Sequence, residues 1–142
     1  MPALNFMIDW ADAVAYGARL AAGQTVTPLT GYPPKRTTIR KAGRAKPGDM
    51  LYLYTGQRTK ACRKLGEALC LAVTPIYVAR ERVSQTPYIR LGAPRPGKEL
   101  ISGVAFERFA RLDTAGLWDA DRFIAFFADA YGLPFDGELI CW

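Results

Sequence analysis

The chain has 142 residues, half of them apolar or aromatic and 23% charged, which predicts a single globular domain over residues 1–142 and excludes a disordered chain. It contains no histidine, which excludes Ser-His and Cys-His nucleophile systems and every metal site that needs an imidazole ligand. Its net charge is +6, and the positive charge is concentrated in residues 35–64, which contain ten Lys or Arg and one acid. Such a basic segment favours polyphosphate or nucleic acid as a partner, and the alternative is a solvated basic surface.

The first half of the chain predicts a helix followed by strands. Ala3–Phe6 is a short apolar run, and from Ile8 to about Leu20 apolar residues recur at spacings of four, which is typical of an amphipathic helix. Gly23–Pro34 is rich in Gly, Thr and Pro without a period, so we expect a long loop there, either a lid or binding loop or a tolerated insertion. Short strands are expected at Thr37–Lys41 and Met50–Thr55.

The second half predicts extended segments and then helices. Gly66–Val78 and Tyr88–Leu91 have the composition of strands. Phenylalanine and alanine recur at spacings of three and four in residues 106–110 and 123–130, which indicates helices, and residues 138–142 suit a closing strand. Strands in the middle of the chain, flanked by helices, predict an α+β domain built on a small curled sheet or β-barrel.

Two further features concern the compartment. Cys62, Cys70 and Cys141 are an odd number without CxxC spacing, so we expect small buried thiols and neither a disulfide framework nor a thiolate zinc site. No run approaches the roughly 18 consecutive apolar residues of a membrane span, and the first residues lack the pattern of a secretory signal. We therefore expect a cytoplasmic protein that does not associate with membranes.

The segment KRTTIR, residues 35–40, follows the predicted loop. If it is a strand, Lys35, Thr37 and Ile39 face one way. The other face then carries one hydroxyl and two guanidinium groups, from Arg36, Thr38 and Arg40. Guanidinium and hydroxyl donors suit a phosphate or a sugar, and a solvated edge strand is the alternative.

The segment LYLYTGQRTKACRKLGEA, residues 51–68, joins aromatic rings to cations. Leu51 and Leu53 alternate with Tyr52 and Tyr54 along the predicted strand. Rings that stack on bases beside cations that neutralise phosphates are typical of single-stranded nucleic-acid binding. The alternative places both tyrosines in the core. The expected nucleic-acid contacts are Arg36, Arg40, Tyr52, Arg58, Thr59, Arg63 and Lys64.

Four segments together resemble the ASCH family, a branch of the PUA-like superfamily: KRTTIR, KPGDMLYLYTG, RTKACRKLGEA and FFADAYGLPFDGELICW. They cover most of the chain in the expected order. The resemblance implies a small β-barrel flanked by helices, with a cleft between them that receives a nucleotide. Some members of the family cleave single-stranded RNA and others are small amidohydrolases on modified cytidine, so membership alone does not separate an enzyme from a binder.

The K-x-x-T-x-R element of the family falls on Lys35, Thr38 and Arg40. The resemblance implies that, as in the amidohydrolase-like members, the lysine and the threonine form the catalytic set together with a carboxylate from the helical C-terminal part. Asp113 is the carboxylate most nearly in place, one methylene shorter than the glutamate of those members. The family also has a glycine two residues before the lysine, where this chain has Pro33.

The leading hypothesis is an RNA-binding protein that cleaves single-stranded RNA through Tyr54, Lys60 and Lys35. Cleavage of RNA without histidine needs another general base and a positive charge at the phosphate. Lys60 is expected to supply one of these, and Tyr54 to position the sugar or to donate a proton. Asp113 orients the lysine or binds a divalent cation such as Mg²⁺ or Mn²⁺. One alternative is an amidohydrolase on an acylated nucleoside such as N4-acetylcytidine, through Lys35, Thr38 and Asp113. Another is a non-catalytic reader of RNA or of a modified base.

Overall fold

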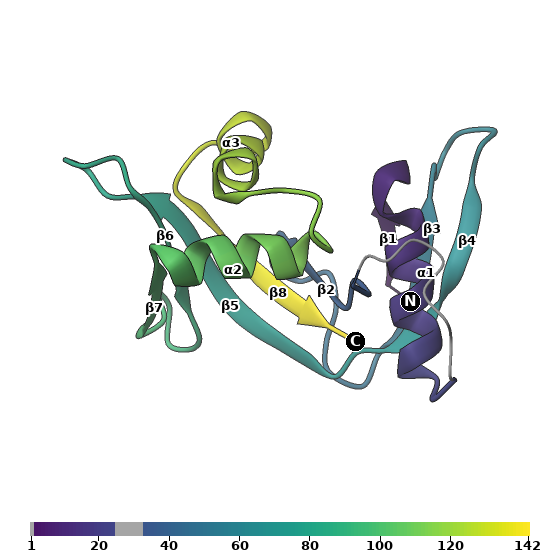
Figure 1. Cartoon of the computed structure of the whole chain (residues 1–142). Coiled ribbons are helices and arrows are strands. Elements are labelled where there is room, and N and C mark those ends of the chain that lie inside the picture. Colours follow the sequence, from purple (N-terminus) through teal and green to yellow (C-terminus); the bar gives the residue numbers. More distant parts are fainter. Residues whose placement is uncertain (1, 25–32) are drawn as a thin grey trace.

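The computed structural model describes residues 2–24 and 33–142. In this part of the chain, strands form two separate sheets and three α-helices pack on them (Figure 1). No helix among the described residues is long and apolar enough to cross a membrane.

The smaller sheet contains strands β1 (Ala3–Phe6), β3 (Met50–Thr55) and β4 (Arg63–Leu69), in the order β1-β3-β4. β1 runs parallel to β3, and β4 runs antiparallel to it. Helix α1 (Ala11–Ala21), preceded by the short 3-10 helix η1 (Ile8–Trp10), packs against β4 and β3. The core between helix and sheet includes Leu4, Val14, Ala18, Leu51 and Leu53.

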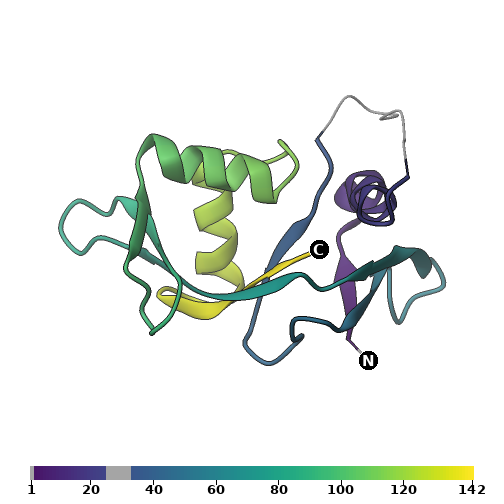
Figure 2. The same cartoon turned by 90° about the horizontal axis from the view of Figure 1, so that it is seen from below.

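The larger sheet is antiparallel and has the order β2-β8-β5-β6-β7. Its strands are β2 (Thr37–Arg40), β5 (Ala72–Arg80), β6 (Pro87–Leu91), β7 (Glu99–Ser102) and β8 (Phe135–Cys141). Figure 2 shows that both remaining helices lie on one side of this sheet.

The two helices on the larger sheet are α2 (Val104–Asp113) and α3 (Ala120–Ala130). Asp119 caps α3, because its Oδ1 accepts a hydrogen bond from the main-chain N–H of Arg122 at 2.9 Å. The phenylalanines that predicted these helices pack under them: Phe106, Phe123 and Phe127 are buried against the sheet.

The α+β class predicted from the sequence is confirmed, but the closed barrel is not, since the strands form two sheets that do not join. The extended stretch predicted at Gly66–Val78 divides into the end of β4 and the start of β5, and the chain passes from one sheet to the other at residues 70–71. The predicted loop Gly23–Pro34 falls mostly on residues 25–32, which lie outside the described residues.

A close contact fixes α1 to the chain just before β2. The main-chain N–H of Lys35 donates to the carbonyl oxygen of Ala13 at 2.9 Å. At Gly17 a Cβ atom would lie 2.1 Å from the carbonyl oxygen of Lys35, so only glycine allows this approach. Lys35 is therefore held against α1 by its main chain.

Candidate functional site

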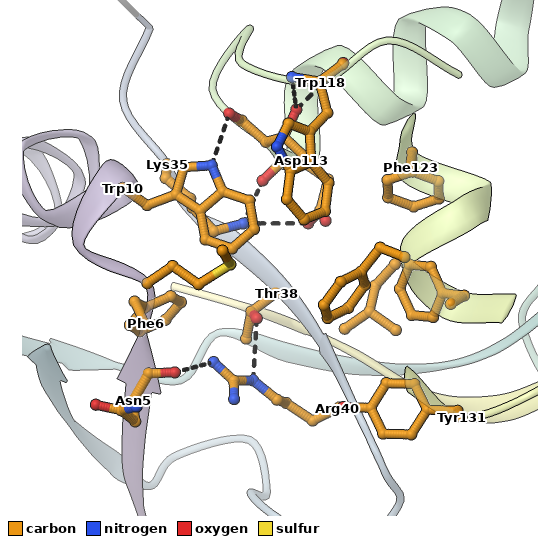
Figure 3. Close-up of a pocket in the computed structure, with 15 residues that line it drawn as sticks. Asn5, Phe6, Trp10, Lys35, Thr38, Arg40, Asp113, Trp118, Phe123 and Tyr131 are labelled. Atoms are coloured by element: carbon orange, nitrogen blue, oxygen red, sulfur yellow. Dashed lines mark hydrogen bonds and ion pairs between the residues drawn. The ribbon is translucent and has the colours of Figure 1, made fainter. Parts of the chain in front are cut away.

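A pocket opens where the two halves of the fold meet, between β1 and η1 on one side and β2, α2 and α3 on the other (Figure 3). Its volume of about 130 Å³ accommodates a single ring or an acyl group. Seven of its fifteen lining residues are aromatic, namely Phe6, Trp10, Trp118, Phe123, Phe126, Phe127 and Tyr131. Four polar residues that the sequence singled out also line it, namely Lys35, Thr38, Arg40 and Asp113.

Lys35 lies at the bottom of this pocket with 2% of its surface exposed. Its Nζ donates to the carbonyl oxygen of Asp113 and lies 3.6 Å from Oδ1 of the same residue. The ammonium group is also 5.0 Å from the centre of the Trp10 ring. Burial lowers the pKa of Lys35 below its ordinary value, more than the negative charge of Asp113 raises it, and the positive charge of Arg40 lowers it further.

Asp113 is the last residue of α2 and is 7% exposed. Besides facing Lys35, its Oδ1 accepts a hydrogen bond from the Thr37 hydroxyl at 2.7 Å. The end of α2 is tied to η1, because Trp10 Nε1 donates to the carbonyl oxygen of Thr114 at 3.1 Å. The Trp10 and Trp118 rings, 4.9 Å apart between centres, close this side of the pocket (Figure 3).

Thr38 and Arg40 form the second polar group of the pocket. Arg40 Nε donates to Thr38 Oγ1 at 3.1 Å, so the threonine oxygen is an acceptor there and its own proton remains to be donated elsewhere. Arg40 Nη2 donates to the carbonyl oxygen of Asn5 at 2.7 Å, and the guanidinium carbon lies 5.0 Å from the Phe6 ring centre. A positive charge therefore lies beside a nearly buried hydroxyl.

The predicted facing of residues 35–40 is wrong in part. β2 begins at Thr37, so Lys35 precedes the strand and does not follow its alternation; it enters the same pocket as Thr38 and Arg40. Arg36 does not join them, because its Nε donates to the carbonyl oxygen of Trp142 at 2.8 Å. Only one guanidinium, that of Arg40, therefore meets the Thr38 hydroxyl.

The other predicted site residues lie on the β3–β4 hairpin, and none of them lines the pocket. Leu51 and Leu53 are fully buried, whereas the alternating Tyr52 and Tyr54 are half-buried, as the strand pattern predicts. The hairpin cations and the adjoining threonine are exposed, namely Arg58, Thr59, Lys60, Arg63 and Lys64.

Two of the hairpin residues have partners close by. Lys64 forms an ion pair with Glu67 and lies 5.2 Å from the centre of the Tyr52 ring. Thr59 Oγ1 donates to the carbonyl oxygen of Gly56 at 2.6 Å. The structure thus divides the predicted site: Lys35, Thr38, Arg40 and Asp113 come together, while Tyr54 and Lys60 remain on the hairpin.

The described residues contain no group of three or more His, Cys, Asp or Glu side chains that could hold a metal ion. The divalent cation expected from the sequence stays a prediction that these side chains do not test.

The sequence did not single out Thr37, Trp10 or Trp118 as site residues. Thr37 is one residue from the threonine that the family element selects, so the sequence pointed to Thr38 and not to the hydroxyl that donates to Asp113. Trp10 contributed to the predicted helix pattern, which is also the pattern of ordinary core residues. That two of the three tryptophans, Trp10 and Trp118, line the same pocket as Lys35 became visible only in three dimensions.

No family model matches the chain. No curated protein matches it, and no solved structure does.

Proposed function

We propose that the chain is an ASCH-type amidohydrolase and that its pocket removes the acyl group from an acylated nucleoside such as N4-acetylcytidine. The observation that carries this proposal is the burial of Lys35 beside Asp113 in a pocket that also holds Thr38 and is walled by aromatic rings. Planar rings against an aromatic wall suit a nucleobase, and a volume of about 130 Å³ leaves the sugar at the mouth.

The lowered pKa of Lys35 supports a role as general base. An ammonium group cannot accept a proton, whereas burial favours the neutral amine, which can. The hydrogen bond to the carbonyl oxygen of Asp113 and the nearby carboxylate fix the position of Nζ. Asp113 is thus a positioning residue, and its shorter side chain still brings Oδ1 to 3.6 Å from the lysine.

We propose acyl transfer to Thr38 followed by hydrolysis of the ester. Lys35, which lines the same pocket as Thr38, takes the Thr38 proton as Thr38 Oγ1 attacks the acyl carbon. The positive charge of Arg40, whose Nε donates to Thr38 Oγ1, stabilises the oxyanion. The C–N bond then breaks, and Lys35 returns the proton to the leaving amine. Water hydrolyses the resulting acyl-threonine ester with Lys35 again as base, which releases the carboxylic acid and restores the enzyme.

The test incubates the protein with N4-acetylcytidine and measures cytidine and acetate by chromatography. We expect Lys35→Met and Thr38→Val to lose at least about 100-fold of kcat, because each removes a group that takes part in proton transfer or attack. The matched control is Lys98→Met, which removes an exposed lysine outside the pocket and should retain full activity. If Thr38→Val kept full activity while Lys35→Met was inactive, the covalent step at Thr38 would be ruled out and the role of Lys35 as general base would stand.

A second candidate function is the binding of single-stranded RNA by the β3–β4 hairpin. It is favoured by the exposure of Arg58, Lys60 and Arg63, which form no ion pair with any carboxylate of the described residues. Such cations neutralise phosphates, and binding then weakens steeply with salt. A ribonuclease at Tyr54 and Lys60 and a non-catalytic reader both use this surface.

The RNA function is tested with a labelled single strand, with Mg²⁺, with Mn²⁺ and with EDTA. Lys60→Ala should weaken binding or abolish cleavage, while Lys98→Ala serves as the control for charge alone. Cleavage that survives in Lys60→Ala would rule out a ribonuclease centre at the hairpin. Binding without product would make the hairpin a reader, and the absence of binding by the parent would refute the RNA function.

A further inference from the structure

A second hollow lies on the larger sheet, on the face that α2 and α3 do not cover. Ile76, Val78 and Ile89 point into the core under the helices, so Tyr77, Tyr88 and Arg90 on β5 and β6 face the opposite way. Arg80 ends β5 on the side of Ile76 and Val78, and its Nη1 donates to the carbonyl oxygen of Gln85 at 3.2 Å, so it contributes to the hollow only at its edge. Figure 2 shows the helices on one side of this sheet only. We call the hollow on the other side the outer groove; it has a volume of about 520 Å³ and is lined by Arg80, Arg82, Thr86, Tyr88, Arg90 and Ser102, among others.

The outer groove holds more positive than negative charge, because three arginines and one glutamate line it. Arg80, Arg82 and Arg90 line it, and none of them forms an ion pair with a carboxylate of the described residues. Its one acidic residue is Glu81, whose Oε2 accepts hydrogen bonds from the main-chain N–H groups of Val83 and Ser84 at 2.9 and 2.6 Å. The carboxylate of Glu81 is therefore engaged within its own turn.

An aromatic surface adjoins these cations. The Tyr77 and Tyr88 rings lie 6.4 Å apart between centres, and Tyr77 lies directly across the strand pair from Arg90. Another hollow beside the outer groove is lined by Tyr77. It shares Arg80, Arg82 and Tyr88 with the outer groove, so that cations and rings form one continuous surface. A guanidinium group can donate two hydrogen bonds to the oxygens of one phosphate, and a nucleobase can stack on a tyrosine ring.

We propose that the outer groove binds a nucleoside monophosphate, independently of the Lys35 pocket. Its phosphate, with a charge of about −1.5 to −2 at pH 7, meets the arginines, and its base lies on Tyr88. The hydroxyls of Thr86 and Ser102 match the ribose hydroxyls, which a phosphotyrosine side chain lacks. The groove volume falls in the range of about 300–1,000 Å³ that is usual for small-molecule sites.

The test titrates AMP into the isotopically labelled full chain at low salt and follows amide signals by NMR. We expect shifts in β5, β6 and β7, with the indole signals of Trp10 and Trp118 unchanged, since both tryptophans line the other pocket. Adenosine and inorganic phosphate should each bind at least about tenfold more weakly, because each keeps only half of the recognised group. These comparisons use the unaltered protein and need no variant to fold.

Variants then locate the phosphate. Arg90→Gln should weaken AMP binding by at least about tenfold, whereas Arg108→Gln, which removes the same charge from the exposed face of α2, should leave it within about twofold. An equal loss in both variants would reduce the effect to net charge and overturn the proposal. So would shifts confined to the tryptophan indoles, phosphotyrosine binding as tightly as AMP, or no binding of AMP at all.

Discussion

Gly17 joins the packing of α1 to the placement of Lys35, and Gly17→Ala tests that link. The added Cβ would lie 2.1 Å from the Lys35 carbonyl oxygen, whereas ordinary contacts begin near 3.4 Å. Because this neighbour is main chain, it cannot rotate away, and the segment before β2 has to move by about 1 Å. Overpacking of this kind costs about 1–3 kcal/mol. In the middle of a helix alanine is worth about 1 kcal/mol more than glycine, so we expect a net loss of up to about 2 kcal/mol.

The assays are urea denaturation, thermal denaturation and turnover of N4-acetylcytidine. A net loss of about 2 kcal/mol, the upper end of this range, lowers the melting temperature by roughly 8 °C in a domain of this size. Displacing Lys35 by about 1 Å should also lower kcat by about 100-fold, although Gly17 touches no substrate.

The control is the reverse change on the same helix, Ala15→Gly, which helix propensity alone predicts to cost about 1 kcal/mol. If propensity were the only effect, the two variants would change stability in opposite directions, whereas we expect both to lose it. A Gly17→Ala protein that is about 1 kcal/mol more stable than the parent would refute the close approach of α1 to Lys35.

Three further predictions concern the site and its supports. Lys35 has a lowered pKa in the folded protein, so between that value and 10.5 the unfolded chain binds one proton more than the folded chain. The free energy of unfolding of the parent, relative to that of Lys35→Met, should therefore rise with pH in this range, by at most about 1.4 kcal/mol per pH unit. Denaturation at a series of alkaline pH values checks this, and parallel curves of stability against pH for the two proteins would contradict it. Trp10→Phe keeps a ring but removes one of two donors to the Thr114 carbonyl, which still accepts from the main-chain N–H of Leu117 at 3.1 Å, and should cost about 0.5–1.5 kcal/mol in the same measurement. Asp119→Ala removes the cap of α3 and should cost about 1 kcal/mol without changing kcat, because Asp119 is exposed and does not line the pocket.

Local patterns in the sequence predicted individual elements well. The strand Met50–Thr55 has the predicted bounds, because alternating leucine and tyrosine carry the whole signal within six residues. The second helix predicted from phenylalanine and alanine spacing is also present, as α3, over Ala120–Ala130. Ala3–Phe6, in contrast, is too short to show a period, and it becomes a strand only through its pairing with β3.

The arrangement of strands was not predictable in the same way. Whether a set of strands closes into a barrel depends on pairings between distant segments, and β2 pairs with β8 almost a hundred residues later. The side chain of Lys35 illustrates the same limit on a smaller scale. Its face was predicted from strand alternation, but the strand begins two residues later, and its contact with Asp113 spans 78 positions.

The buried charges are the strongest argument that the Lys35 pocket has a function. Removing Lys35 and Asp113 from water costs more than their mutual attraction returns in most proteins, and apolar side chains of similar size often fold as well or better. The dominant effect on the pKa of Lys35 is burial, so the ion pair with Asp113 does not compensate for it. What the arrangement does supply is an amine that can be neutral and a hydroxyl beside a fixed positive charge, which are the groups that amide hydrolysis without histidine requires.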